Sequence, residues 1–162
     1  MLVAALTLPF LTLYMVLTVT LGWHDVRTGL LPDRFTCPLL WSGLLFYACL
    51  LPGALVDAVF GAVVAYGAFA TLCWGFRRVC HREGMGYGDV KYLAALGAWH
   101  GWQHFPQLIT VASGLALAWV GFQMLASWSG EAIKNPLRFG PFLSAAGFVT
   151  GLNSGLFFHF NL

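Results

Sequence analysis

Two aspartates stand at polar breaks between long apolar stretches, and their positions favour acid–base chemistry. Asp89 follows Gly84, Gly86 and Gly88, three glycines at alternate positions, and opens an apolar stretch. Asp25 stands near the end of an earlier apolar stretch. The chain has only six carboxylates in 162 residues. Because a carboxylate in or beside a bilayer is costly, each one indicates a functional role.

The two carboxyls form an aspartyl dyad if neighbouring helices bring Asp25 and Asp89 together. Carboxyls a few ångströms apart cannot both ionise at neutral pH, so they share one proton. The ionised member then activates water, and the protonated member donates to the carbonyl oxygen of a peptide bond. The helix dipole predicts Asp89, at a helix start, as the base and Asp25, at a helix end, as the proton holder. Taken singly, each aspartate also fits a plainer role, a helix cap or a solvated helix end.

Composition excludes an ordinary soluble domain. The chain is 59% hydrophobic and 9% charged, whereas soluble domains carry roughly 25% charged residues. A net charge of +2 gives no reason to expect a nucleic-acid partner. The four cysteines form no Cys-x-x-Cys pair. The pair His100 and His104 has no neighbour in sequence that would complete a ligand set, so neither a metal nor a cofactor is expected.

The apolar stretches predict an all-α, polytopic membrane helix bundle, with residues 1–162 forming a single domain. A helix needs about 20 apolar residues, with a range near 17 to 25, to cross a bilayer. The breaks between stretches carry Gly and Pro turn signals. Six transmembrane helices are expected, over Leu2–Trp23, Phe35–Leu51, Ala54–Gly75, Asp89–His104, Pro106–Ser127 and Gly140–Phe160.

The basic residues predict the orientation of these helices. All eight Lys and Arg fall in or beside the first, third and fifth breaks, and the second and fourth breaks have none. Lys and Arg concentrate in cytoplasmic loops, so these three breaks are expected on the cytoplasmic side and both termini on the outer side. The same orientation places Asp25 and Asp89 at the cytoplasmic face.

Small residues recur at helical spacing in the third and fourth stretches. They are expected to let helices approach closely, as small residues do within membranes. The two predicted faces are Gly61, Ala65 and Ala68 on one stretch, and Ala94, Ala98 and Gly101 on the other.

The chain resembles a known family in the segments around both aspartates. The matching segments are Gly84-Met85-Gly86-Tyr87-Gly88-Asp89-Val90-Lys91 with 93–99, Asp25 with Leu31-Pro32-Asp33 and 38–44, and Arg138-Phe139-Gly140-Pro141-Phe142-Leu143. In these segments it resembles the type IV prepilin leader peptidases, bacterial Gly-x-Gly-Asp membrane aspartyl proteases. The resemblance covers nearly the whole chain, and the two aspartate motifs together make it specific.

This resemblance implies that Asp25 and Asp89 are the catalytic pair of an aspartic-type endopeptidase in the bacterial inner membrane. The implied substrate is a prepilin or pseudopilin of a type IV pilus or type II secretion system. Its short basic leader would be removed after a glycine at the cytoplasmic face. Expected substrate contacts, including two acids that would attract the leader, are Gly86, Tyr87, Gly88, Asp33, Glu83, Phe139, Gly140 and Pro141.

Longer members of the family also methylate the new N-terminus and carry two Cys-x-x-Cys pairs in an additional N-terminal region. This chain begins close to the first catalytic helix and lacks those pairs, so a short, peptidase-only form is expected and N-methyl transfer is not.

Three other functions fit parts of the sequence. A small transporter or ion-conducting protein would use Asp25 and Asp89 as proton or cation sites. A serine intramembrane protease would need Ser154 and His159 as nucleophile and base. A membrane scaffold would need neither aspartate, and none of the three explains the alternating glycines before Asp89.

Overall fold

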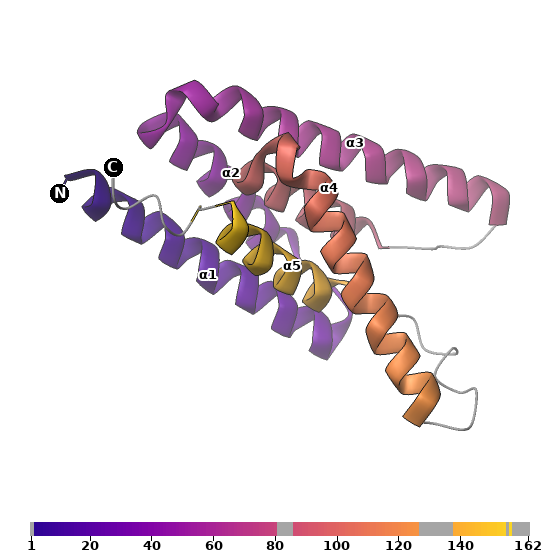
Figure 1. The fold of residues 1–162 in the computed structure, drawn as a ribbon. Coiled ribbons are helices and arrows are strands. Elements are labelled where there is room, and N and C mark those ends of the chain that lie inside the picture. The colour runs from indigo at the N-terminus through magenta and orange to yellow at the C-terminus, as the bar shows by residue number, and fades with distance from the viewer. Residues whose placement is uncertain (1, 81–85, 127–137, 155, 157–162) are drawn as a thin grey trace.

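The computed structural model describes residues 2–80, 86–126, 138–154 and 156, and this part of the chain is helical without any strand. The predicted all-α class is therefore confirmed for the described residues. Their helices lie side by side as a bundle from which one end of α3 and one end of α4 project (Figure 1). The elements are α1 (Leu2–Thr28), α2 (Asp33–Leu50), the short 3-10 helix η1 (Pro52–Ala54), α3 (Leu55–Cys80), α4 (Tyr87–Ala126) and α5 (Gly140–Asn153).

Helix α4 combines the predicted fourth and fifth helices and breaks between them at Gly101. This residue has a φ of 72° and a ψ of 168°, a backbone conformation that only glycine adopts readily. The helix changes direction sharply at the break, so its second half runs back along the bundle (Figure 1). The boundary lies earlier than predicted, and Pro106 continues the second half. With the break counted, the described residues form six helical segments in the predicted order.

Three of the helices are long and apolar enough to cross a bilayer. The candidate spans are Leu6–Thr28, Pro52–Val79 and Tyr87–Leu125. Helix α2 has 18 residues, and the described part of the predicted last helix ends at Asn153. The chain is thus a helical membrane protein, whereas six spans and outward-facing termini remain predictions.

The first half of α4 is the central helix of the bundle. Every residue from 92 to 101 is buried, which fits a helix that is apolar around its whole circumference. The Trp99 indole donates a hydrogen bond of 2.8 Å to the Leu39 backbone oxygen of α2. The hydroxyls of Tyr92 and Ser144 lie 2.8 Å apart and join α4 to α5. These contacts fix the central helix against its neighbours and so fix the position of its first turn.

Helices α3 and α4 cross where neither has a side chain. A Cβ placed on Gly61 would collide with the Gly97 backbone oxygen and lie 2.9 Å from the Gly101 Cα. Ala65 is fully buried beside this crossing, whereas Ala68 is exposed. The prediction of close-packed small faces is therefore confirmed for Gly61 and Ala65. It is wrong for Ala68, because the face turns away from α4 there.

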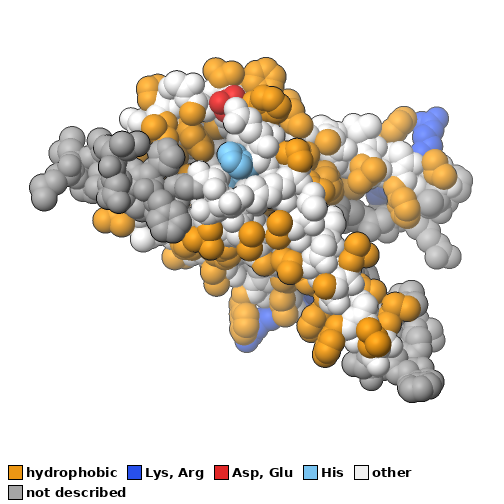
Figure 2. Space-filling model, viewed as in Figure 1, with side chains coloured by type: hydrophobic (Ala, Val, Ile, Leu, Met, Phe, Trp, Pro, Cys, Tyr) orange, Lys and Arg blue, Asp and Glu red, His pale blue; other side chains and the backbone are white. Residues whose placement is uncertain are grey.

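Positive charge gathers at one end of the bundle. The last turns of α1 and α3 and the first turns of α2 and α4 meet there, together with the start of α5. Figure 2 shows Lys and Arg side chains toward this end, and on the same face an acidic and a histidine patch toward the other end. Six of the eight basic residues are described and all lie here, namely Arg27, Arg34, Arg77, Arg78, Lys91 and Arg138.

The α3–α4 crossing predicts a large difference between two glycines of α3. Gly61→Leu should lower the free energy of unfolding by about 1–3 kcal/mol, since overpacking forces the backbones apart. Gly67→Leu should change it by less than about 0.5 kcal/mol, because nothing lies within 4 Å of a Cβ at Gly67. Unfolding of the purified protein in detergent measures both. Equal effects would show that the helices do not meet at Gly61.

Candidate active site

Asp25 lies in the last turn of α1, which continues beyond the predicted end at Trp23. It is only 4% exposed, and its Oδ2 accepts a hydrogen bond of 3.0 Å from the Gly140 backbone N–H. Gly140 is the first residue of α5, whose own flanking residue Phe139 provides no side-chain cap. Asp25 therefore caps a second helix through space, and the positive end of the α5 dipole faces its carboxylate.

The backbone around Asp25 is also held by two donors. The Gly29 N–H donates to the Asp25 backbone oxygen at 2.8 Å, with Gly29 in the left-handed conformation at a φ of 68°, a common way to end a helix. The Arg138 Nη1 donates to the same oxygen at 3.3 Å, and its positive charge acts on the Asp25 carboxylate. Sequence reasoning treated Arg138 as a topology signal and missed this role. In the sequence, the one signal for this role is the position of Arg138, two residues before Gly140.

Asp89 lies in the first turn of α4, as predicted, and is half-buried. Its carboxylate accepts a backbone hydrogen bond from Gly86 and feels the charge of Asp25. The hydrogen bonds of the described residues include none between the two carboxyls. The structure thus brings both aspartates to one end of the bundle, within electrostatic range of each other.

The alternating glycines before Asp89 differ in their surroundings. A Cβ on Gly88 would lie 3.0 Å from the Leu31 Cβ, so the absent side chain lets the loop after α1 approach α4. A Cβ on Gly86 would meet the Asp89 Oδ2 at 3.6 Å and the Gly88 backbone nitrogen at 3.9 Å, both ordinary contacts. Gly84 lies outside the described residues. At Gly88 the missing side chain therefore admits the protein's own chain.

His24 stabilises the loop that contacts Gly88. Its Nδ1 donates to the Leu30 backbone oxygen at 3.0 Å, and the Thr28 hydroxyl lies 2.9 Å from the same nitrogen. Although His24 precedes Asp25 in the chain, its ring is engaged with the loop and makes no hydrogen bond to that carboxylate in the described structure. Its ring therefore positions the loop, and its electrostatic influence also reaches the Asp25 carboxyl.

Asp33 and Lys91 form an ion pair across the α2–α4 contact. The Lys91 Nζ donates to both carboxylate oxygens of Asp33 at 2.8 Å. Asp33 is therefore neutralised by a partner on the helix that carries Asp89, which weakens its expected role in attracting a basic leader. Glu83, the other acid given that role, lies outside the described residues.

The remaining predicted residues border this end in different ways. Tyr87 is 52% exposed, and the Arg77 guanidinium lies 5.7 Å from its ring centre. Phe139 is half-buried, and Pro141 lines an apolar groove described below. Ser154 lies at the opposite end of α5, where its hydroxyl bonds Gly151, and His159 is not among the described residues.

An apolar groove of about 530 Å³ runs between the second half of α4 and the start of α5. Pro141 and Phe142 form one wall, directly after the Gly140 that binds Asp25. The opposite wall consists of α4 side chains, namely Leu115, Ala118, Trp119 and Phe122. The groove therefore begins one residue beyond the Gly140 that binds Asp25.

The fold and site define a helical membrane protein with paired acids at one end, and comparison with known proteins gives its family. The chain belongs to the type IV leader peptidase family, whose model matches residues 5–122. The chain is similar to leader peptidase HopD of Escherichia coli, with 56% identity over 148 residues that cover 91% of this chain and 95% of the relative. It is also similar to HopD of Salmonella typhimurium, with 54% identity and coverage of 89% and 92%.

A longer relative shares the same region. The prepilin leader peptidase/N-methyltransferase of Escherichia coli (strain K12) is 43% identical over 139 residues, which cover 86% of this chain and 60% of that protein. The prediction of a leader peptidase is thus confirmed at the level of the family. No solved structure matches the chain significantly.

The different surroundings of Gly88 and Gly86 predict that alanine substitutions at these two positions reduce peptidase activity unequally. Gly88→Ala should lower kcat/KM by up to about 10-fold, because its Cβ would displace Leu31 or the first turn of α4 by a few tenths of an ångström, a fraction of the displacement of about 1 Å that costs about 100-fold. Gly86→Ala should retain most of the activity, since the added methyl makes only ordinary contacts, at 3.6 and 3.9 Å. Cleavage kinetics of the two purified variants provide the test. A larger loss for Gly86→Ala would contradict the assigned contacts.

Because Asp33 and Lys91 form an ion pair, the effects on activity of substituting them should not be additive. Asp33→Asn and Lys91→Gln should each reduce activity modestly, and the double variant should resemble either single variant, with a coupling free energy of up to about 1 kcal/mol for an exposed pair. Cleavage kinetics of all four proteins give this coupling. If Asp33 instead binds the substrate directly, Asp33→Asn will raise KM equally with and without Lys91.

Proposed function

We propose that this protein is an aspartyl endopeptidase that removes the short basic leader from a type IV prepilin or pseudopilin, with Asp25 and Asp89 as its catalytic pair. One observation carries the proposal. Two aspartates far apart in the sequence lie in terminal helix turns at the same end of the bundle, where the loop after α1 packs against Gly88 at the start of α4. The named activities of the similar proteins, leader peptidase and prepilin leader peptidase, support the substrate class.

In the proposed mechanism, the ionised carboxyl of the pair takes a proton from a water molecule. That water attacks the peptide carbonyl after the leader glycine, and the protonated carboxyl donates to the carbonyl oxygen. General acid–base catalysis by positioned carboxyls contributes typically 10²- to 10⁴-fold in rate. The carboxyl that took the proton from water then gives it to the leaving nitrogen, and the other carboxyl takes a proton back from a hydroxyl of the tetrahedral intermediate. Collapse releases the leader and the new N-terminus, and the pair again shares one proton.

The surroundings of Asp25 bear on which acid holds the proton. The dipole of α1 alone predicts Asp25, because the end of a helix disfavours negative charge. The start of α5 and the charge of Arg138 act in the opposite direction at the same carboxylate. Asp89 has its own backbone donor in Gly86. That Asp25 holds the proton stays a prediction. Whether it does depends on the charge of Arg138 and the dipole of α5 as well as on the dipole of α1.

The apolar groove is a candidate binding site for the membrane-embedded part of the substrate. Its walls are apolar and aromatic, so an apolar helix following the scissile bond would lie there without exposing polar groups. Pro141 joins the groove to Gly140 and hence to Asp25. We propose that Phe139, Gly140 and Pro141 border the bound substrate where it reaches the acids.

The distribution of basic residues supports a cytoplasmic position for the site. The six described Lys and Arg lie at the same end as Asp25 and Asp89, and this end is expected on the cytoplasmic side of the bacterial inner membrane. The transporter alternative receives less support, because both aspartates lie in terminal helix turns whereas transport sites lie near the bilayer midplane.

The proposed pair predicts that Asp25→Asn and Asp89→Asn each reduce cleavage of a prepilin precursor by about 10²-fold or more. Each variant loses a titrating group while retaining nearly the same shape. The assay uses purified protein in lipid, with product followed by mass spectrometry and folding checked by thermal unfolding. A precursor whose cleavage-site glycine is replaced provides the substrate control. Full activity in either folded variant would end the dyad proposal.

A further inference from the structure

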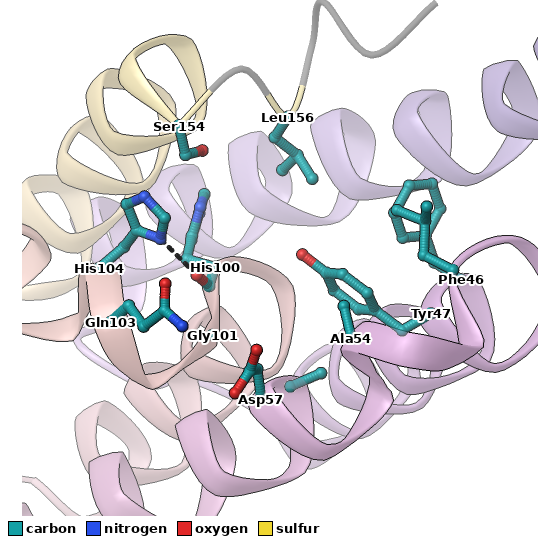
Figure 3. Close-up of a pocket in the computed structure, with 12 residues that line it drawn as sticks. Phe46, Tyr47, Ala54, Asp57, His100, Gly101, Gln103, His104, Ser154 and Leu156 are labelled. Carbon is teal, nitrogen blue, oxygen red and sulfur yellow. Dashed lines mark hydrogen bonds between the residues drawn. The ribbon is translucent and has the colours of Figure 1, made fainter. Parts of the chain in front are cut away.

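A second pocket lies at the end of the bundle opposite to Asp25 and Asp89. It has a volume of about 260 Å³ and opens where the end of α2, the start of α3, the break in α4 and the end of α5 meet. Figure 3 shows side chains from these elements around one space. Its polar lining is Tyr47, Asp57, His100, Gln103, His104 and Ser154.

The hydrogen bonds within this pocket consume donors and leave acceptors. The His104 Nδ1 donates to the His100 backbone oxygen at 2.9 Å, so the Nε2 of the neutral ring carries a lone pair. The Tyr47 hydroxyl donates to the Trp99 backbone oxygen at 2.8 Å, which leaves the phenolic oxygen as an acceptor. Asp57 receives one hydrogen bond, of 2.9 Å, from the Trp102 indole to Oδ1, and Oδ2 remains available.

Charge at this end is unbalanced. Asp57 is the only one of the four described carboxylates located here, and the six described Lys and Arg lie at the other end. No ion pair to Asp57 occurs within the described residues. No three His, Cys, Asp or Glu side chains in that part of the chain are arranged to hold a metal ion. The free acceptors and the unbalanced charge of Asp57 therefore favour a ligand that carries hydrogen-bond donors and positive charge.

We propose that this pocket binds the primary ammonium group of a small amine or lipid headgroup. An ammonium offers three donors and a positive charge, which match the Asp57 carboxylate and the Tyr47 phenolic oxygen that face the same space (Figure 3). The lining also includes Phe46 and Leu156, which provide an apolar surface for the short carbon chain that carries the ammonium. Aromatic rings favour a nearby cation as well. The pocket volume suits a headgroup-sized ligand.

Two probes separate a free amine from a lipid. Ethanolamine is titrated into the purified protein in detergent by calorimetry. Phosphatidylethanolamine is compared with phosphatidylglycerol in nanodiscs by native mass spectrometry. Saturable binding of either amine probe supports the site and identifies its source. Ethylene glycol, which has the same size without the charge, should not bind.

The variant test uses Asp57→Asn, which keeps an acceptor for the Trp102 indole and therefore preserves the fold. It should weaken amine binding about tenfold or more, since a charge-assisted contact is lost. Asp33→Asn removes the same charge at the opposite end and should bind the amine normally. Three results would overturn the proposal: equal binding by Asp57→Asn and the unaltered protein, equal binding of ethylene glycol, or absence of saturable binding by both amine probes.

Discussion

The hydrogen bond from the Gly140 N–H to Asp25 is the interaction on which the architecture of the site depends. A buried carboxylate needs donors, because burial without them costs several kcal/mol. Asp25 obtains its donor from the start of α5, which in turn lacks a side-chain cap of its own. Each helix end thus satisfies the other. A Cβ at Gly140 would lie 2.7 Å from the Asp25 Oδ2, so only glycine permits this contact without displacing the carboxylate.

Missing side chains determine the other helix contacts in a similar way. At Gly22 a Cβ would lie 2.7 Å from the Ser144 hydroxyl oxygen, and at Gly43 it would lie 2.8 Å from the Trp99 ring. Within a bilayer, apolar helices gain little from leaving lipid, so close packing and interhelical hydrogen bonds stabilise the bundle. The glycines allow that packing, and the bonds of Ser144 and Trp99 use the short distances that result. The first turn of α4, which carries Asp89, is positioned by this packing.

The sequence predicts those features of the fold that arise from local pattern. Apolar stretches predict the helices, Gly and Pro signals predict the breaks to within a few residues, and the scarcity of carboxylates directs attention to Asp25 and Asp89. Contacts between distant segments leave no such local pattern. The pairing of Asp33 with Lys91 and the capping of α1 by Arg138 arise from the packing of α2, α4 and α5. The acceptor-rich pocket is missed for the same reason, since Asp57 and His104 lie on different helices.

The dual position of Asp25 also shows why a dipole argument from one helix is incomplete. Its own helix α1 presents a partial negative charge to the carboxylate, and the facing helix α5 presents a partial positive charge. These contributions oppose each other at one group, and the full charge of Arg138 adds to that of α5. Asp89 lies at the start of its own helix, where the Gly86 backbone and the charge of Asp25 act on it. The two acids therefore differ in how they are positioned. Asp25 lies on α1 and contacts α5, whereas the position of Asp89 depends on that of α4. A change in the angle of α5 would alter the electrostatic potential at the Asp25 carboxylate directly. It would affect Asp89 only through the charge of Asp25.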